Sequence, residues 1–307
     1  MTHTQLQSAP HFYIVGAAKA GTTAVWTWLQ SHPDVFLPDV KEPGFFAFEG
    51  ENATPHNGPY DPNYVSEVTT DAQTYQDIYS GAGGRICGDV SPVYLIAEHA
   101  AARIAAARPD ARIVILLRDP VKRAFSQYLH HVRDCLEPSM TFEAALDAEN
   151  ERLAQGWSWG HGYATHGHYA RQIERYLDVF PREQILFLTH EDIQSNPEKC
   201  WHLLCEHLQL AACPMPNNER VNETANLSSV SSRAGISRAL RHPGAIQTAV
   251  KRMIPKFVRS RLRKTLEGAG RPVPQLRTGT RARLSELYMP ERSTLEKLTG
   301  LSLGHWT

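Results

Sequence analysis

The sequence predicts an α/β fold in which helices flank a central parallel sheet. Short apolar runs alternate with helical patterns through the first two thirds of the chain, the order expected of such a sheet. The run at 113–117 has five consecutive aliphatic residues, which is typical of a strand covered by helices on both faces. With 307 residues, 42% of them hydrophobic, the chain can bury a substantial core, which excludes disorder as its main state.

Strands are expected where apolar runs end at turn-forming residues. The first run, FYIV, ends at Gly16, and the run ILFL follows Pro181 and a short polar stretch. The expected strands cover 12–15, 35–37, 85–87, 113–117 and 185–188.

Helices are expected between these strands, and proline residues set several of their ends. Pro109 and Pro181 each stop a helical pattern, whereas Pro120 and Pro197 fit the first turn of one. The expected helices cover 21–30, 94–107, 120–133, 142–153, 168–179, 197–208 and 280–288. Since no internal repeat divides the chain, we expect residues 1–307 to form a single domain.

Charge is distributed unevenly, although 32 Lys and Arg balance 32 Asp and Glu. Residues 39–98 contain ten acids and two bases, whereas residues 233–277 contain twelve bases and one acid, a net charge of +11. We expect this basic segment to be mostly helical. It fits a lid, an attractor for an anionic acceptor, or, through residues 245–266, an amphipathic helix in peripheral contact with a membrane. A solvated helix that packs its apolar side on the core is an equal alternative.

The five cysteines form an odd set in a chain too large to need disulfides, which favours a reducing compartment. The N-terminal residues show no basic start followed by an apolar run, and the stretch 113–117 is far shorter than the roughly 20 residues that span a bilayer. We therefore expect a cytoplasmic protein. No metal site is expected, because Cys200 and Cys205 are spaced to diverge on a helix.

A glycine-bounded loop follows the first expected strand and precedes a helix. Such a loop offers backbone N–H groups and a positive helix end to an anion. The spacing of Gly16 and Gly21 copies a nucleotide-binding P-loop, but Thr22 stands where that loop has its lysine, and Lys19 is the only cation. This departure counts against hydrolysis of a nucleoside triphosphate. A purely structural strand-to-helix turn is the alternative.

A second polar group follows the run 113–117. Arg118 comes where this strand ends, at the sheet edge where α/β folds bind ligands. Ser126 lies eight residues later, about two helical turns into the next helix. An arginine fork and a hydroxyl at one edge suit a second phosphate. Alternatively, Arg118 pairs with a carboxylate and Ser126 simply packs.

Together these motifs resemble the sulfotransferases that use 3′-phosphoadenosine 5′-phosphosulfate (PAPS), especially the heparan-sulfate-type branch and its bacterial relatives. The resemblance is strong from about residue 12 to 210 and weaker beyond. It rests on five segments in the family's order, which are residues 13–23, the KEPGFF segment at 41–46, GDVSPVYL at 88–95, residues 118–128 and residues 168–192. The resemblance implies the P-loop NTPase-like sulfotransferase fold, with PAPS as co-substrate and no metal.

The resemblance also implies a role for each matching residue. Lys19 would stabilise the leaving oxygen, Lys41 would lie near the sulfuryl group or the acceptor, and Asp89 would be the general base. The 5′-phosphate would be held by Ala20, Gly21, Thr22 and Thr23, and the 3′-phosphate by Arg118, Ser126 and, from a late loop, Arg233. Alternatively, Asp89 is a satisfied carboxylate at a strand end or pairs with Lys41.

The expected reaction is in-line transfer of a sulfuryl group from PAPS to a hydroxyl, or in second place an amine, of a glycan, lipid or small metabolite. The alternatives are a P-loop kinase-like phosphotransferase and a non-catalytic anion-binding module. No nucleic-acid partner is expected, and the sequence predicts no oligomeric state.

Overall fold

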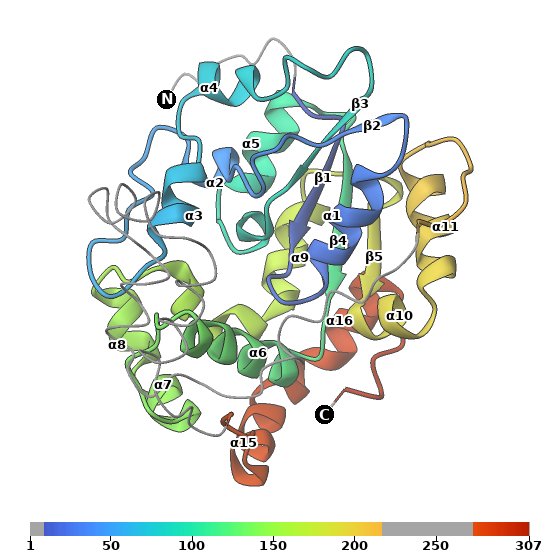
Figure 1. Ribbon diagram of the computed structural model, residues 1–307. Helices are drawn as coiled ribbons and strands as arrows, with labels where there is room; N and C mark the ends of the chain where they lie inside the picture. The colour runs from blue at the N-terminus through green and yellow to red at the C-terminus, as the bar shows by residue number, and fades with distance from the viewer. Residues whose placement is uncertain (1–8, 217–272, 307) are drawn as a thin grey trace, which may run out of the picture.

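A five-stranded parallel sheet forms the centre of the computed structural model, which describes residues 9–216 and 273–306 (Figure 1). The strand order is β2-β3-β1-β4-β5, and every neighbouring pair is parallel. The predicted α/β fold is therefore confirmed. The strands are β1 (Phe12–Gly16), β2 (Val35–Phe36), β3 (Ile86–Val90), β4 (Arg112–Leu117) and β5 (Ile185–Thr189).

Helices cover both faces of this sheet, with α1 in front of the strands and α9 behind them in Figure 1. The helices before β4 are α1 (Thr22–Gln30), α2 (Phe45–Phe48), α3 (Pro62–Glu67), α4 (Ala72–Asp77) and α5 (Ala100–Ala107). Those between β4 and β5 are α6 (Pro120–Arg133), α7 (Phe142–Asp147), α8 (Glu149–Ala154) and α9 (Tyr169–Leu177). After β5 come α10 (His190–Ser195), α11 (Pro197–His207), α15 (Thr278–Tyr288) and α16 (Arg292–Thr299).

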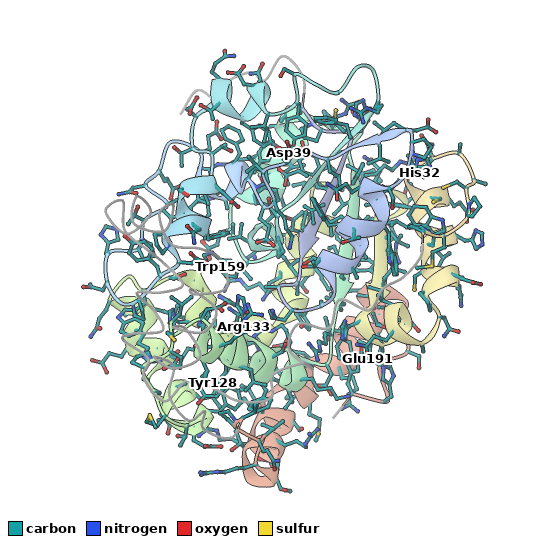
Figure 2. All side chains as sticks on the ribbon, in the orientation of Figure 1. His32, Asp39, Tyr128, Arg133, Trp159 and Glu191 are labelled. Atoms are coloured by element: carbon teal, nitrogen blue, oxygen red, sulfur yellow. The ribbon has the colours of Figure 1, made fainter. Side chains whose placement is uncertain are left out.

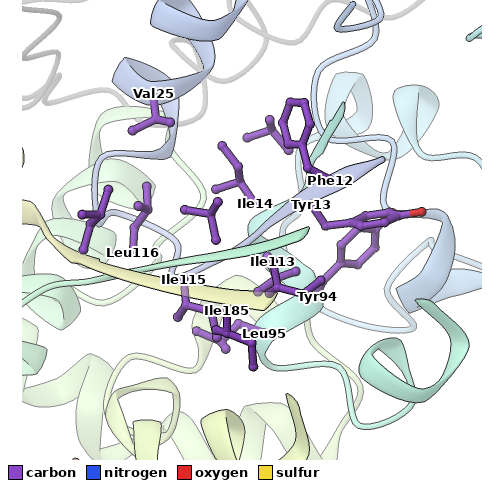
Figure 3. Packing of buried hydrophobic residues seen from close by; sticks show 14 of the residues in the cluster. Phe12, Tyr13, Ile14, Val25, Tyr94, Leu95, Ile113, Ile115, Leu116 and Ile185 are labelled. Atoms are coloured by element: carbon purple, nitrogen blue, oxygen red, sulfur yellow. The ribbon is translucent and has the colours of Figure 1, made fainter. Parts of the chain in front are cut away.

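The core lies between the sheet and these helices. Residues 113–117 of β4 are fully buried, and each such side chain contributes about 1.5–3 kcal/mol relative to exposure. Figure 3 shows the alternation along the strands, with Ile14 and Leu116 on the side of Val25 and Tyr13 on the side of Tyr94. A second cluster of buried residues joins α6, α7 and α15.

Two predicted helices differ in the structure. Residues 94 and 95, expected to begin the helix 94–107, belong to the 3₁₀ turn η1 (Pro92–Leu95), and α5 begins only at Ala100. The helix expected at 142–153 is divided at Ala148, which ends α7 and precedes α8. By contrast, α6 has the predicted bounds, because Asp119 accepts N–H groups from Val121 and Lys122 and Pro120 occupies its first turn.

β3 is longer than predicted, and this matters for the site. The sequence predicts a strand over 85–87, whereas β3 continues to Val90. Asp89 therefore lies inside the sheet, paired in register with Tyr13 of β1, and not beyond the strand end.

Candidate active site

The loop between β1 and α1 presents an uncapped helix N-terminus. No side chain caps α1, whose preceding residue Gly21 has a φ of 101°. Lys19 also has a positive φ, 69°, which is uncommon for a residue with a side chain. Because the first N–H groups of a helix have no partners within it, those of Thr22 and Thr23 are available to an anion.

This loop opens on a cavity of about 1260 Å³. Since sites for one small ligand usually occupy about 300–1,000 Å³, the space is large enough for a nucleotide and a second molecule. The cavity brings together most of the residues predicted from the sequence. They are Lys19, Gly21, Thr22, Thr23, Lys41, Arg118 and Ser126.

Arg118 lies directly after β4, beside the loop between β1 and α1. In the sheet, β2 and β3 lie on one side of β1, whereas β4 and β5 lie on its other side. Open α/β sheets bind ligands at such a switch point, here between β1 and β4. One nitrogen of Arg118, Nη1, donates to the carbonyl oxygen of Lys19 at 2.9 Å. Its buried Nε has no hydrogen-bond partner among the described residues. Burial lowers the pKa of Arg118 while the charge of Glu191 raises it. An arginine N–H that is buried without a partner fits an anionic ligand.

The turn after β2 brings Lys41 and Glu42 to the same cavity. Lys41 Nζ donates to Thr23 Oγ1 at 2.9 Å and lies 3.7 Å from Glu42 Oε1. Glu42 has a φ of 62°. The Glu42 side chain is 22% exposed, and burial raises its pKa, although Lys41 and then Lys19 oppose the shift. A carboxylate with a raised pKa, in an accessible cavity, is suited to act as a general base.

The position of Asp89 differs from the one expected of a general base. Its carboxylate is fully buried and does not line the cavity. It accepts hydrogen bonds from the hydroxyls of Ser91 at 2.6 Å, Tyr75 at 2.7 Å and Tyr94 at 2.7 Å. Burial raises the pKa of Asp89, and these hydroxyls oppose the shift. A group enclosed in this way cannot approach an acceptor, so the prediction that Asp89 is the base is wrong; the alternative of a satisfied carboxylate fits.

The Asp89 network supports the turn that carries Glu42. Ser91 Oγ accepts the backbone N–H of Gly44 at 3.0 Å, and the Tyr94 hydroxyl accepts that of Phe46 at 3.4 Å. The hydroxyls that donate to Asp89 therefore hold the backbone just after Glu42. Asp89 is a positioning residue in this arrangement, acting through Ser91 and Tyr94.

Ala20 is fully buried, does not line the cavity, and donates its N–H to the Ala17 carbonyl at 3.1 Å, so it cannot hold a phosphate as predicted. Arg233 and the basic residues 233–272, including 245–266, lie outside the described residues, so their roles stay predictions. Residues 273–277, the end of the segment expected to be mostly helical, are not helical.

Glu42 is a candidate base that was not predicted from the sequence, although it lies in the segment 41–46. A signal was present, since Glu42 is the carboxylate next to Lys41 in KEPGFF. A wall of the cavity was also not predicted; it is formed by two segments, residues 52–65, which include the start of α3, and residues 156–161. No motif marks those segments, because they meet only in the folded chain.

Over residues 9–216 and 273–306, no group of three or more His, Cys, Asp or Glu side chains could hold a metal ion. The same part of the chain contains no helix that is both long and apolar enough to cross a membrane.

Comparison with known proteins relates the chain to enzymes of sulfate transfer. The family model described as "Sulfotransferase family" matches residues 10–214. Human heparan sulfate glucosamine 3-O-sulfotransferase 3B1 is 30% identical over 190 residues, which are 61% of this chain and 43% of that protein. The chain thus spans less than half the length of this curated relative.

Solved structures agree with this likeness. A sulfotransferase from Alicyclobacillus acidocaldarius superposes with a TM-score of 0.75 at 29% identity, covering 97% of this chain and 99% of that one. A mouse sulfotransferase solved in complex with PAP gives a TM-score of 0.50 at 12% identity, with 98% and 92% coverage. This second likeness shows the fold alone.

Proposed function

Because the chain belongs to the sulfotransferase family, we propose that it transfers a sulfuryl group from PAPS to a hydroxyl, or in second place an amine, of an acceptor. One observation carries this proposal. A single cavity joins the uncapped N-terminus of α1, the cations Lys19 and Lys41, and the carboxylate of Glu42. There, Lys19 and Lys41 would face the negative charge on the leaving side, and Glu42 would face the acceptor proton.

The proposed co-substrate site has two anion-binding parts. The N–H groups of Gly21, Thr22 and Thr23, with the two threonine hydroxyls, would hold the 5′-phosphate. Arg118, whose buried Nε has no described partner, and Ser126 would hold the 3′-phosphate. Two separate phosphate positions distinguish PAPS from adenine nucleotides that have one phosphate chain.

The proposed chemistry is an in-line displacement at sulfur. PAPS supplies an activated sulfur–oxygen bond, which breaks as the acceptor oxygen bonds to sulfur. Glu42 accepts the acceptor's proton, a contribution of about 10²–10⁴ in rate for a well-placed base. Lys19 and Lys41 stabilise the negative charge that develops on the leaving side, for which one placed donor is worth about 10²–10³.

Calorimetric titration tests the proposal against the kinase alternative. Tight binding of adenosine 3′,5′-bisphosphate (PAP) with no binding of ATP is the expected result, because Thr22 stands where a P-loop has its lysine. Binding of ATP without PAP would overturn the proposal. Incubation with labelled PAPS and mixed hydroxyl acceptors then establishes transfer.

A further inference from the structure

Two segments, residues 52–65 and 156–161, form one wall of the cavity, which we call the aromatic wall. The backbone N–H of His56 donates to the Gly156 carbonyl at 3.0 Å, and Asn57 Nδ2 donates to the Gln155 carbonyl at 2.6 Å. These contacts hold the segments together across about a hundred residues of sequence. Four aromatic side chains of the wall line the cavity, which are Tyr60, Tyr64, Trp157 and Trp159.

The aromatic wall lines the same cavity as the proposed base. Glu42 and Tyr64 line the same cavity, and the negative charge of Glu42 adds to the larger effect of burial in raising the pKa of Tyr64. Tyr64 packs edge-to-face on Trp159, with ring centroids 6.2 Å apart. Trp159 lies between α3 and α6 in Figure 2. A molecule that presents a hydroxyl to Glu42 would therefore have its remaining atoms against these rings.

The lysines and arginines that line the cavity all lie outside the aromatic wall. They lie on the loop between β1 and α1, on the turn after β2, where β4 leads into α6, and on α15. By contrast, no lysine or arginine is among the lining residues of the aromatic wall, and Asp61 is its one Asp or Glu. Burial lowers the pKa of His161 and lowers that of His130 to about 3, which disfavours a positive charge on these two histidines.

Resting on the proposed function, we propose that the acceptor is an uncharged hydroxyl compound that packs a sugar or aromatic ring on Tyr60, Tyr64 and Trp159. Flat aromatic side chains bury a ring without a charge partner. An anionic acceptor would instead place its charge beside Asp61, in a wall whose lining residues include no lysine or arginine, and like charges at close range cost affinity. The wall thus selects against the polyanionic chains that a basic cleft would attract.

Matched acceptors test this selection. The 4-nitrophenyl β-glucoside and β-xyloside are neutral, whereas the corresponding β-glucuronide differs from them at one carbon and carries a carboxylate. The xyloside controls for the extra hydroxyl of the glucoside. With labelled PAPS, kcat/KM for both neutral glycosides should exceed that for the glucuronide by about tenfold or more. Equal or faster reaction of the glucuronide overturns the proposal, as does failure of both neutral compounds to react or to bind the PAP complex.

A capping aspartate provides a matched pair of variants. Asp61 caps α3 by accepting the N–H of Asn63 at 2.9 Å, and asparagine can keep that bond. In Asp61→Asn, the preference for glucoside over glucuronide should fall by about threefold to tenfold. Asp71 caps α4 in the same manner but does not line the cavity, so Asp71→Asn should keep the wild-type preference. An unchanged preference in Asp61→Asn contradicts the charge argument.

The ring contact has its own test. Trp159→Ala should raise KM for the glucoside by about tenfold, and Trp159→Phe should restore most of this loss. PAP affinity separates a local effect from misfolding. If the wild-type protein binds no PAP, the proposed function itself is contradicted. If it binds PAP but prefers the glucuronide, only the acceptor inference is contradicted.

Discussion

Lys41 donates a hydrogen bond from Nζ to Oγ1 of Thr23 at 2.9 Å and so joins the turn after β2 to the first turn of α1. The same ammonium lies 3.7 Å from Glu42 Oε1. Through Lys41, the proposed base is thus connected to the loop proposed to hold the 5′-phosphate. The site depends on two segments that are separate in sequence and are brought together at one end of the sheet.

Replacement of Lys19 tests the anion-stabilising loop. Lys19→Ala should lower kcat by about 10²–10³, because the leaving oxygen loses a placed cation. Lys199→Ala is the charge-matched control, since that lysine is exposed and does not line the cavity. Steady-state kinetics with labelled PAPS measure both variants. Full activity in Lys19→Ala would favour the non-catalytic anion-binding alternative.

Replacement of Glu42 tests the base. Glu42→Gln should lower kcat by about 10²–10⁴ while calorimetry shows nearly unchanged affinity for PAP, because the amide keeps the shape but accepts no proton. Retention of wild-type turnover in this variant would remove Glu42 from the mechanism.

The pH dependence follows from the direction of the Glu42 pKa shift. Catalysis requires the carboxylate, and burial raises its pKa above the ordinary value of 4.5. Activity should therefore be lost as pH falls through a pKa higher than 4.5, with a one-proton slope in kcat/KM. A profile that stays flat down to pH values well below that point is incompatible with this assignment.

Asp89→Asn separates a positioning residue from a base. Asparagine cannot accept all three hydroxyl hydrogen bonds in the same geometry, so the free energy of unfolding should fall by about 1–3 kcal/mol in a urea titration. Turnover should decrease but keep the wild-type pH profile, because Glu42 is still present. Complete loss of turnover with unchanged stability would restore Asp89 as the base.

Arg118 is expected to recognise the 3′-phosphate. Arg118→Ala should reduce the affinity ratio of PAP to AMP by about tenfold or more, since a charge-assisted contact to that phosphate is lost. Arg171→Ala, which removes an exposed arginine of α9 away from the cavity, is the control. If the ratio is the same in both variants, the 3′-phosphate is bound elsewhere.

The sequence predicted the position of Lys19 and Arg118 well for a physical reason. Each follows a strongly apolar strand, and the carboxyl ends of parallel strands meet at one edge of the sheet. Local pattern alone therefore brings these residues into one site. The backbone N–H of Ala20 shows the limit of this reasoning, because it is used within the loop and a motif does not reveal which N–H groups are free.

The sequence around Glu42 and Asp89 does not show which of these two carboxylates reaches the cavity. A strand ending at residue 87 would place Asp89 past the sheet edge, but β3 continues to Val90 and turns Asp89 toward the hydroxyls of Tyr75 and Tyr94. Strand length and register decide which side of a sheet a residue faces. Neither is specified by the few residues around it.

The sequence by itself determined the parallel α/β architecture, the glycine-bounded loop between β1 and α1 and the arginine at the sheet edge, because strand and helix periodicity and turn glycines are local properties. The tertiary structure decided which carboxylate reaches the cavity and which wall faces it. Those features depend on contacts such as that of His56 with Gly156, which join distant segments only when the chain is folded.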